Sequence, residues 1–265
     1  MRSIYSTDFM DRDPYFAMGR GAVEGVDFVH KFGRNAAVGA ALETIWSAGG
    51  LYSYLTAATV LKVSSGDVDD TIAGAGARTV ELQGLDASYL PITELVKLNG
   101  QTAVNTKKLF LRIFRMRALT AGASGKNEGI IYAGTGNITT GVPDNIYAQI
   151  DAGLSQTLMA LYTIPAGMQG CISLHRQHSS ISKVIVSHMC VRAPGEIFQV
   201  KDVIPYTEGE VNTEFRPALP VGERSDIEIR ALATGGGGDI GASFTVWLSR
   251  PEGARIHENL PGVLK

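Results

Sequence analysis

The sequence predicts an all-β protein, a β-sandwich or jelly roll of about ten to twelve short strands with an extended N-terminal arm. Three observations lead to this fold class. Short segments alternate apolar and polar residues, turn residues separate them at intervals of about eight to twelve residues, and no long segment has a helical period. The 31 glycines among 265 residues exceed the usual share of about 7% and fall mostly in the turns, as many short strands require.

Composition argues against several kinds of partner and scaffold. With a formal net charge of −2, the chain lacks the strongly basic surface of an ordinary nucleic-acid-binding protein, so we expect no nucleic-acid partner. No apolar run approaches the roughly 18 residues that a membrane-spanning helix needs, so we expect no membrane partner. Two cysteines are too few for a disulfide scaffold. Apolar residues make up 45% of the chain, enough for a sizeable hydrophobic core.

The chain is expected to form one sandwich with an extension at each end. Residues 1–33 have no clear period and several aromatic side chains, which favours an arm that docks on a partner over a disordered tail. Residues 34–250 form the predicted sandwich, and no Pro- or Ser-rich linker divides them. The glycine-rich stretch at 134–145 is the candidate sub-boundary within it. Residues 251–265 are interpreted as a C-terminal tail.

The first half of the predicted sandwich is a β-meander from Val60 to Arg117. Asn99-Gly100 lies between two alternating runs, and both residues tolerate the positive φ of a type I′ turn, so the pair predicts a β-hairpin. Upstream, Asn35 to Trp46 fits a helix or a strand, and the Gly49-Gly50 turn after it favours the extended form. The meander strands are expected at residues 61–64, 79–82, 93–98 and 109–116.

The second half continues the same pattern of strand and turn. The two most regular strands are Asp226 to Leu232 and Ser243 to Leu248, joined by four consecutive glycines at 235–238. Pro165-Ala166-Gly167 predicts a tight turn, since Pro fixes φ at its second position and Gly allows the reversal. Other strands are expected at residues 130–133, 147–150, 157–164, 169–176, 183–191 and 196–204.

One cluster of residues could carry chemistry. If a hairpin turns near Ser180, Cys171 and Cys190 lie opposite each other, with His175 and His188 on the same face. This arrangement would suit a metal site or a cross-strand disulfide, or simply two buried thiols beside two surface histidines. A flat sheet face spreads its ligands too far for tetrahedral zinc. We therefore expect no metal, no cofactor and no catalytic residues, and the chain contains no GxSxG, HExxH, P-loop or CxxC motif.

Five segments carry a pattern of their own: ETIWSAGGLY (43–52), AGAGARTVELQGLDASY (73–89), TELVKLNG (93–100), SDIEIRA (225–231) and GASF (241–244). Together they resemble virion structural proteins of tailed bacteriophages, many of them marine. The match spans most of Val38 to Leu248 and leaves both extensions outside it. The resemblance implies a virion component and is specific to the family, but it does not imply a particular position in the particle.

Three functions follow as hypotheses. The first is a capsid decoration, or cement, protein that binds the major capsid protein on the surface of the phage head, bridges shell subunits and forms a homotrimer. Such a protein would reside in the host cytoplasm during assembly. The second is a tail, baseplate or receptor-binding protein with a sugar-binding face at Trp46, Tyr52, Tyr54 or Trp247. The third, an enzyme on a jelly-roll scaffold, would need the Cys/His cluster to be a real site.

The two extensions supply the residues expected to contact a partner. Each lacks a core of its own and carries apolar side chains that would gain order only against another surface. The expected contact residues are Tyr15, Phe16, Phe28, Phe32, Ile256, Leu260 and Leu264.

Overall fold

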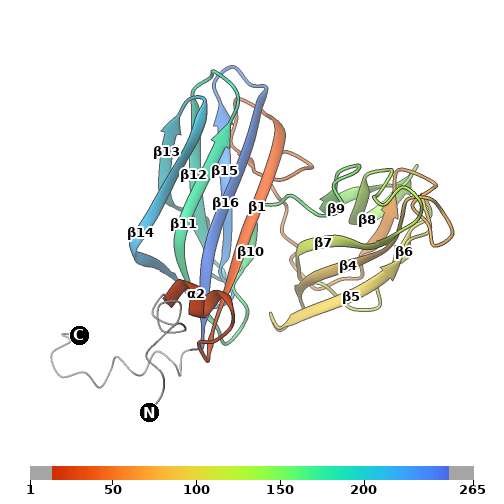
Figure 1. Cartoon of the computed structure of the whole chain (residues 1–265), viewed down its shortest axis with the longest axis horizontal. Coiled ribbons are helices and arrows are strands. Elements are labelled where there is room, and N and C mark those ends of the chain that lie inside the picture. The colour runs from red at the N-terminus through yellow and green to blue at the C-terminus, as the bar shows by residue number, and fades with distance from the viewer. Residues whose placement is uncertain (1–13, 251–265) are drawn as a thin grey trace, which may run out of the picture.

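The computed structural model describes residues 14–250 and places most of them in antiparallel β-strands (Figure 1). The all-β sandwich predicted from the sequence is thereby confirmed. Helical structure in the described part of the chain is confined to the six-residue α2 (Pro14–Gly19), and no helix there is long and apolar enough to cross a membrane. The strands divide into two groups, each with its own hydrophobic core.

The larger group of strands is a sandwich of nine strands, the jelly-roll lobe. One sheet consists, in spatial order, of β1 (Val26–Val38), β16 (Gly238–Ser249), β11 (Gln169–Ser179) and β14 (Gly209–Val221). The facing sheet consists of β10 (Leu161–Thr163), β15 (Asp226–Ala233), β12 (Ile185–Arg192) and β13 (Gln199–Tyr206), with β2 (Glu43–Thr44) also paired to β15. From β10 onward the chain passes repeatedly between the two sheets, which gives the strand order of a jelly roll.

Alternation along the strands forms the core of this lobe. In β16, every second side chain from Ile240 through Phe244 to Leu248 is buried, while Thr245 and Trp247 between them are part-exposed. Successive side chains of a strand point to opposite faces, so a period of two places one row between the sheets. The facing sheet contributes a matching row from β15 that includes Ile227 and Ile229.

The smaller group of strands, the insert lobe, is inserted between β2 and β10 (Figure 1). One of its sheets has the order β6 (Val104–Asn105), β3 (Lys62–Ser65), β8 (Ile131–Thr139) and β9 (Val142–Ile150). The other has the order β5 (Pro91–Lys97), β4 (Ala77–Leu85) and β7 (Arg112–Ala121). The second core lies between these sheets and contains Leu61, Leu82, Phe110 and Met116.

The chain enters and leaves the insert lobe at one narrow neck. Trp46 and Met159 form an antiparallel bridge, and the backbone nitrogen of Ala160 donates to the oxygen of Ile45 over 2.9 Å. Gly33 of β1 lies against this neck, where an added Cβ would sit 2.2 Å from that same oxygen. The strand can therefore pass the neck only because residue 33 has no side chain.

The division of the chain differs from the expected one. Residues 134–145 form the turn and inner halves of the β8–β9 hairpin, in which Gly141 has a φ of 81°. Its glycines serve a positive-φ turn and close strand contacts, and they do not mark a linker. The two cores instead separate at the neck, within the region expected to be a single sandwich. The insertion needs no long linker because its two ends meet.

The expected N-terminal arm is also divided. Residues 26–33 are the first part of β1, whose register on β16 begins with Val26 opposite Ser249. The alternation of apolar and polar residues does not indicate this strand, because Phe28 and Phe32 point to the outer face while Lys31 is buried. Only residues before Val26 precede the sandwich.

The predicted Asn99-Gly100 hairpin is wrong. The strand before it, β5, pairs with β4, and the residues after it continue to β6, which pairs with β3 in the other sheet. Gly100 does have a positive φ, 59°, as the turn requires. The turn therefore sends the chain across to the other sheet of the lobe, and does not return it beside the strand that it left.

Candidate functional site at the junction of the two lobes

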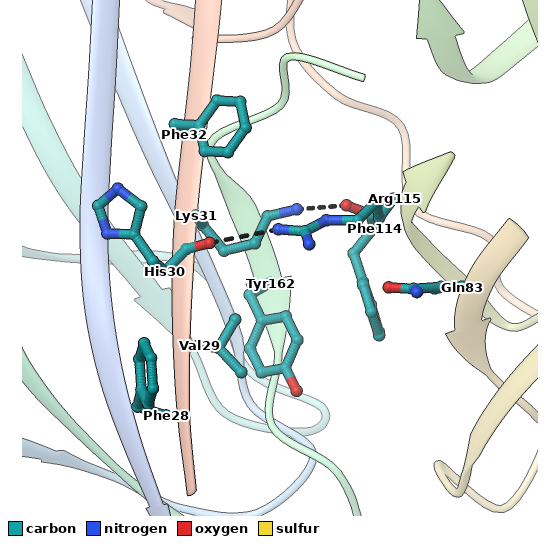
Figure 2. A pocket seen from close by; sticks show the side chains of 9 residues that line it. All are labelled: Phe28, Val29, His30, Lys31, Phe32, Gln83, Phe114, Arg115 and Tyr162. Atoms are coloured by element: carbon teal, nitrogen blue, oxygen red, sulfur yellow. Dashed lines mark hydrogen bonds between the residues drawn. The ribbon is translucent and has the colours of Figure 1, made fainter. Parts of the chain in front are cut away.

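The expected partner contacts fall in three places. Tyr15 and Phe16 lie in α2, and the side chain of Phe16 is exposed. Phe28 and Phe32 lie in β1, where the ring of Phe28 packs 5.6 Å from that of Trp247. Outside the described residues lie Ile256, Leu260 and Leu264. Of these contacts, the structure brings together Phe28 and Phe32, which border the space between the two lobes (Figure 2).

The predicted pairing of Cys171 with Cys190 is wrong. Cys171 lies in β11 opposite Pro220 and Trp247, whereas Cys190 lies in β12 of the facing sheet. After β11 the chain crosses the sandwich and does not fold back beside itself. Both thiols are free, and in the part of the chain that the structure describes no three His, Cys, Asp or Glu side chains gather as metal ligands would.

The two histidines of that cluster are separated as well. His175 is fully buried between the sheets, with Nδ1 3.0 Å from a carboxylate oxygen of Asp202 in β13. Burial lowers the pKa of His175, and the hydrogen bond to Asp202 opposes that shift. His188 lies in β12 at a half-buried position. This separation removes the geometry that the enzyme hypothesis required.

Three of the four aromatic residues proposed for a sugar-binding face lie where the lobes meet: Trp46 and Tyr52 are buried, and Tyr54 is part-buried. Trp46, Tyr52 and Tyr54 form a chain of edge-to-face contacts, with ring centroids 5.0 and 4.8 Å apart. Burial raises the pKa of both tyrosines, as expected where water is excluded. Only Trp247 lies on an outer sheet face. The other three rings pack the junction between the lobes.

A buried ion cluster holds the junction on one side. Arg112 of β7 binds Asp226 of β15 through two hydrogen bonds of 2.9 and 3.2 Å, and both side chains are almost fully buried. Arg192 and Thr163 each place a further donor 2.6 Å from this carboxylate. Burial alone would lower the pKa of Arg112, but Asp226 more than offsets it and the pKa is raised. The cluster is thus a charge-compensated contact between the lobes.

A second buried acid stands beside the first. Glu228 of β15 accepts a hydrogen bond from the hydroxyl of Tyr54 at 3.0 Å and pairs with Arg230. Burial raises the pKa of Glu228, and the Arg230 charge opposes the shift. The guanidinium of Arg192 lies 4.4 Å from the centre of the Tyr54 ring, a cation–π distance. Aromatic and ionic contacts together therefore join β15 to the segment that leads into the insert lobe.

A cleft of about 480 Å³ separates the lobes on the other side of the junction, between β1 and β7 (Figure 2). Its apolar lining comes from both lobes: Phe28, Val29, Phe32, Phe114 and Tyr162. Its polar lining consists of His30, Lys31, Gln83 and Arg115. Figure 2 shows Lys31 and Arg115 reaching across this space from opposite lobes. The ammonium of Lys31 donates to the backbone oxygen of Phe114, and Arg115 donates to that of His30 over 3.4 Å.

The cleft concentrates positive charge. Only 2% of Lys31 is exposed, and burial together with the nearby Arg115 charge holds its pKa well below the ordinary value of 10.5. Burial also lowers the pKa of His30, with smaller effects from Arg176, Arg115 and Lys31. None of the nine residues lining the cleft is acidic. A set of donors whose charge is not compensated, in a concave space at a lobe interface, is a candidate binding site.

The sequence reasoning found only part of this site. It selected Phe28 and Phe32 as contact residues but not the lysine between them, nor Phe114 and Arg115. The run FVHKF at 28–32 gives no usable signal, because alternation would place the row of Phe28 and Phe32 in the interior and Lys31 on the surface, the reverse of what the structure shows. Arg115 carries no signal either, because it is 84 positions away and meets Lys31 only through the packing of the two lobes.

Comparisons with known proteins find weak structural similarity and no sequence match. No family model matches the chain, and no curated protein matches it. A chain of the infectious bursal disease virus Gx strain is 12% identical with a TM-score of 0.25, and the match covers 91% of this chain and 74% of that one. The VP2 subviral particle of the same virus gives 10% identity, a TM-score of 0.19, and coverage of 92% and 75%. These structural neighbours are weak and come from a virus particle.

Proposed function

We propose that this chain is a structural component of a phage virion, a decoration protein that binds the major capsid protein on the head surface and bridges shell subunits. The observation that carries the proposal is the two-sheet jelly roll with a second β lobe inserted at one neck, because jelly rolls of this strand order serve viral shells. The resemblance of five segments to phage virion proteins supports the same role. In this role the chain acts by assembly and is not an enzyme.

Both chain extensions start from the same end of the jelly-roll lobe, which suits an anchoring role. Val26 at the start of β1 pairs with Ser249 at the end of β16, and the nitrogen of Arg250 donates to the oxygen of Gly25 over 3.4 Å. Residues 1–13 and 251–265 can therefore reach the same neighbouring subunit. Apolar area that they bury there would stabilise the complex by roughly 25 cal/mol per Å² before ordering costs.

An edge strand supports self-association. β13 is the last strand of its sheet, and Val200 and Val203 on it are each about half exposed. Ile197, just before β13, is 82% exposed. An unpaired strand edge with apolar side chains is a surface that proteins cover, and a symmetric copy can cover it. The proposed homotrimer would use this edge.

A substitution in that edge tests the homotrimer. Val203→Lys places a charge on the exposed side chain without touching either core, so the fold should remain while the trimer dissociates. Light scattering coupled to size exclusion should give three times the chain mass of 28.2 kDa for the original protein and a single chain mass for the variant. Ala36→Lys on β1, the edge strand at the other side of the sandwich, is also at an exposed position; it is the matched control and should stay trimeric. A wild-type protein that elutes as a monomer contradicts the proposal.

Head binding is tested with truncations placed by the structure. Deletion of residues 1–13 or 251–265 leaves every described strand intact, whereas deletion of 1–33 would remove over half of β1 and so damage the jelly roll. We expect full-length protein to bind undecorated phage heads and both short truncations to lose binding while keeping the same melting temperature. Undiminished binding by both truncations would refute the anchoring role of the extensions.

The runner-up is a tail, baseplate or receptor-binding protein. The cleft between the lobes is the observation that favours it, because a concave aromatic and cationic site suits a ligand better than a shell contact. Labelling the chain in intact particles separates the two roles. Many copies over the head support decoration, and a few copies at the tail support receptor binding.

A further inference from the structure

We infer that the cleft between β1 and β7 binds an acidic sugar, with the carboxylate between Lys31 and Arg115 and the sugar ring against Phe32 and Phe114. This inference goes beyond the structural role and does not depend on where in the virion the chain lies. It rests on the charge, the burial and the shape of the cleft.

The positive charge of the cleft indicates an anionic ligand. Lys31 and Arg115 approach from opposite lobes, and the acceptors that they find are the backbone oxygens of Phe114 and His30 (Figure 2). Neither side chain forms an ion pair with any carboxylate in the described part of the chain. A carboxylate with two oxygens can accept from an ammonium and a guanidinium at once, which makes it the matching partner.

Burial of the Lys31 ammonium increases the stabilisation that a bound carboxylate would provide. An ammonium removed from water loses its hydration, and a backbone carbonyl replaces only part of it. This desolvation is the main reason why the pKa of Lys31 is held well below its ordinary value, and the neighbouring Arg115 lowers it further. A bound anion would reverse both effects, because it supplies opposite charge to each cation. Binding should therefore be coupled to protonation of Lys31.

The walls of the cleft point to a ring with hydroxyl groups rather than a bare ion. The rings of Phe114 and Tyr162 pack with centroids 4.8 Å apart, and Phe32 lies on the opposite side in β1. Gln83 and the Tyr162 hydroxyl add neutral hydrogen-bonding groups to the lining. A volume of about 480 Å³ is in the range of small-ligand pockets. An inorganic anion would leave the aromatic walls without a partner.

The test is binding of free monosaccharides to the full chain, measured by calorimetry or ligand-observed NMR. D-glucuronate supplies the ring and the charge, D-glucose only the ring, and acetate only the charge. We expect glucuronate to bind at least about tenfold more tightly than either, since a charged hydrogen bond contributes roughly this factor or more. Arg115→Gln should weaken glucuronate binding by about tenfold or more and leave glucose unchanged.

Two further variants keep the test independent of folding. Lys31→Met replaces the buried ammonium with an apolar chain of similar length and should also weaken glucuronate binding. Lys97→Gln, in β5 at the other edge of the same sheet and exposed, should leave binding unchanged. Equal binding of glucuronate and glucose, or full binding by Arg115→Gln, would overturn the site. Binding of glutamate or acetate as tight as that of glucuronate would overturn the sugar and indicate a simple carboxylate.

Discussion

Two cations are buried where the lobes meet, and only one of them has a counter-charge. Arg112 shares Asp226 with Arg192 and Thr163, so its charge is balanced within the protein. Lys31 has the backbone oxygen of Phe114 and a like-charged neighbour, Arg115. A buried charge without a counter-charge costs several kcal/mol, so the second arrangement works against stability. The contrast indicates that the Arg112 side holds the lobes together and the Lys31 side is kept for binding.

The largest effect should come from removing the counter-charge on the compensated side. Asp226→Asn keeps the shape of the side chain but removes the carboxylate that pairs with the buried Arg112 and the part-buried Arg192. We expect a loss of about 3–5 kcal/mol in the free energy of unfolding, the usual cost of breaking a buried ion pair. Urea denaturation followed by tryptophan fluorescence measures it.

An exposed ion pair on the jelly-roll lobe provides the control for that substitution. Asp239 pairs with Arg34 at 2.7 Å, with both side chains substantially exposed. Asp239→Asn should therefore cost between about 0 and 1 kcal/mol. If the two variants lose the same stability, the junction cluster is no more important than a surface pair, and the contrast between the two sides fails.

The pH dependence of the free energy of unfolding reports on Lys31, the buried cation that has no counter-charge. Because the pKa of Lys31 is lowered in the folded state, the unfolded chain binds more protons between the folded pKa and 10.5. Stability should rise with pH through that window, and the penalty should be complete below the folded pKa. Lys31→Met removes this contribution, so the difference in stability between variant and original should change by about 1.4 kcal/mol per pH unit within the window.

The measurement is urea denaturation of both proteins from pH 6 to 10. Tyr54 and Tyr162 also have raised pKa values, and they lower stability as pH rises above about 10, but both proteins contain them and their effect cancels in the difference. A difference that stays constant over the whole range would show that Lys31 carries no penalty. The inference from its uncompensated charge would then be lost.

The smallest expected effect concerns Glu228, the second buried carboxylate on the Arg112 side of the junction. Tyr54→Phe removes the hydroxyl that donates to Glu228 and leaves the ring contacts in place. Arg230 still pairs with Glu228, so we expect a loss of only about 1.5 kcal/mol. Thermal unfolding measures it, with Tyr132→Phe in the insert lobe as the matched control. A larger loss than that of Asp226→Asn would reverse the order of the two acids.

How much of the fold the sequence could predict depended on where each strand finds its partner. The alternating runs at 226–232 and 243–248 correspond to β15 and β16, and the glycines between them turn with positive φ at 235–237. Local pattern was enough there, because apolar residues on the core face of each strand alternate with mostly polar residues on the other face. Strand pairing could not be predicted in this way. Cys171 and Cys190 lie in different sheets, because the chain crosses the sandwich after β11. A pattern of period two reports a strand but not its neighbour.

The site was predicted less well, for a related reason. Phe28 and Phe32 could be chosen because exposed aromatic residues at a chain end suggest a contact. The importance of Lys31 and Arg115 depends on the lobes meeting, which no local window contains. The aromatic residues Trp46 and Tyr52 were wrongly predicted to lie on a surface, since packing at the junction buries both and leaves the neighbouring Tyr54 only part-exposed.

The neck between the lobes also has a consequence for the order of folding. All strand pairings of the insert lobe lie within one continuous stretch, so its sheets can form as soon as that stretch has left the ribosome. β1 must wait for β16, more than 200 residues later, since their register joins Val26 to Ser249. Pairings of such long sequence separation close slowly. A chain in synthesis should therefore carry a finished insert lobe beside an open strand, and premature termination before β16 would leave that strand free to aggregate.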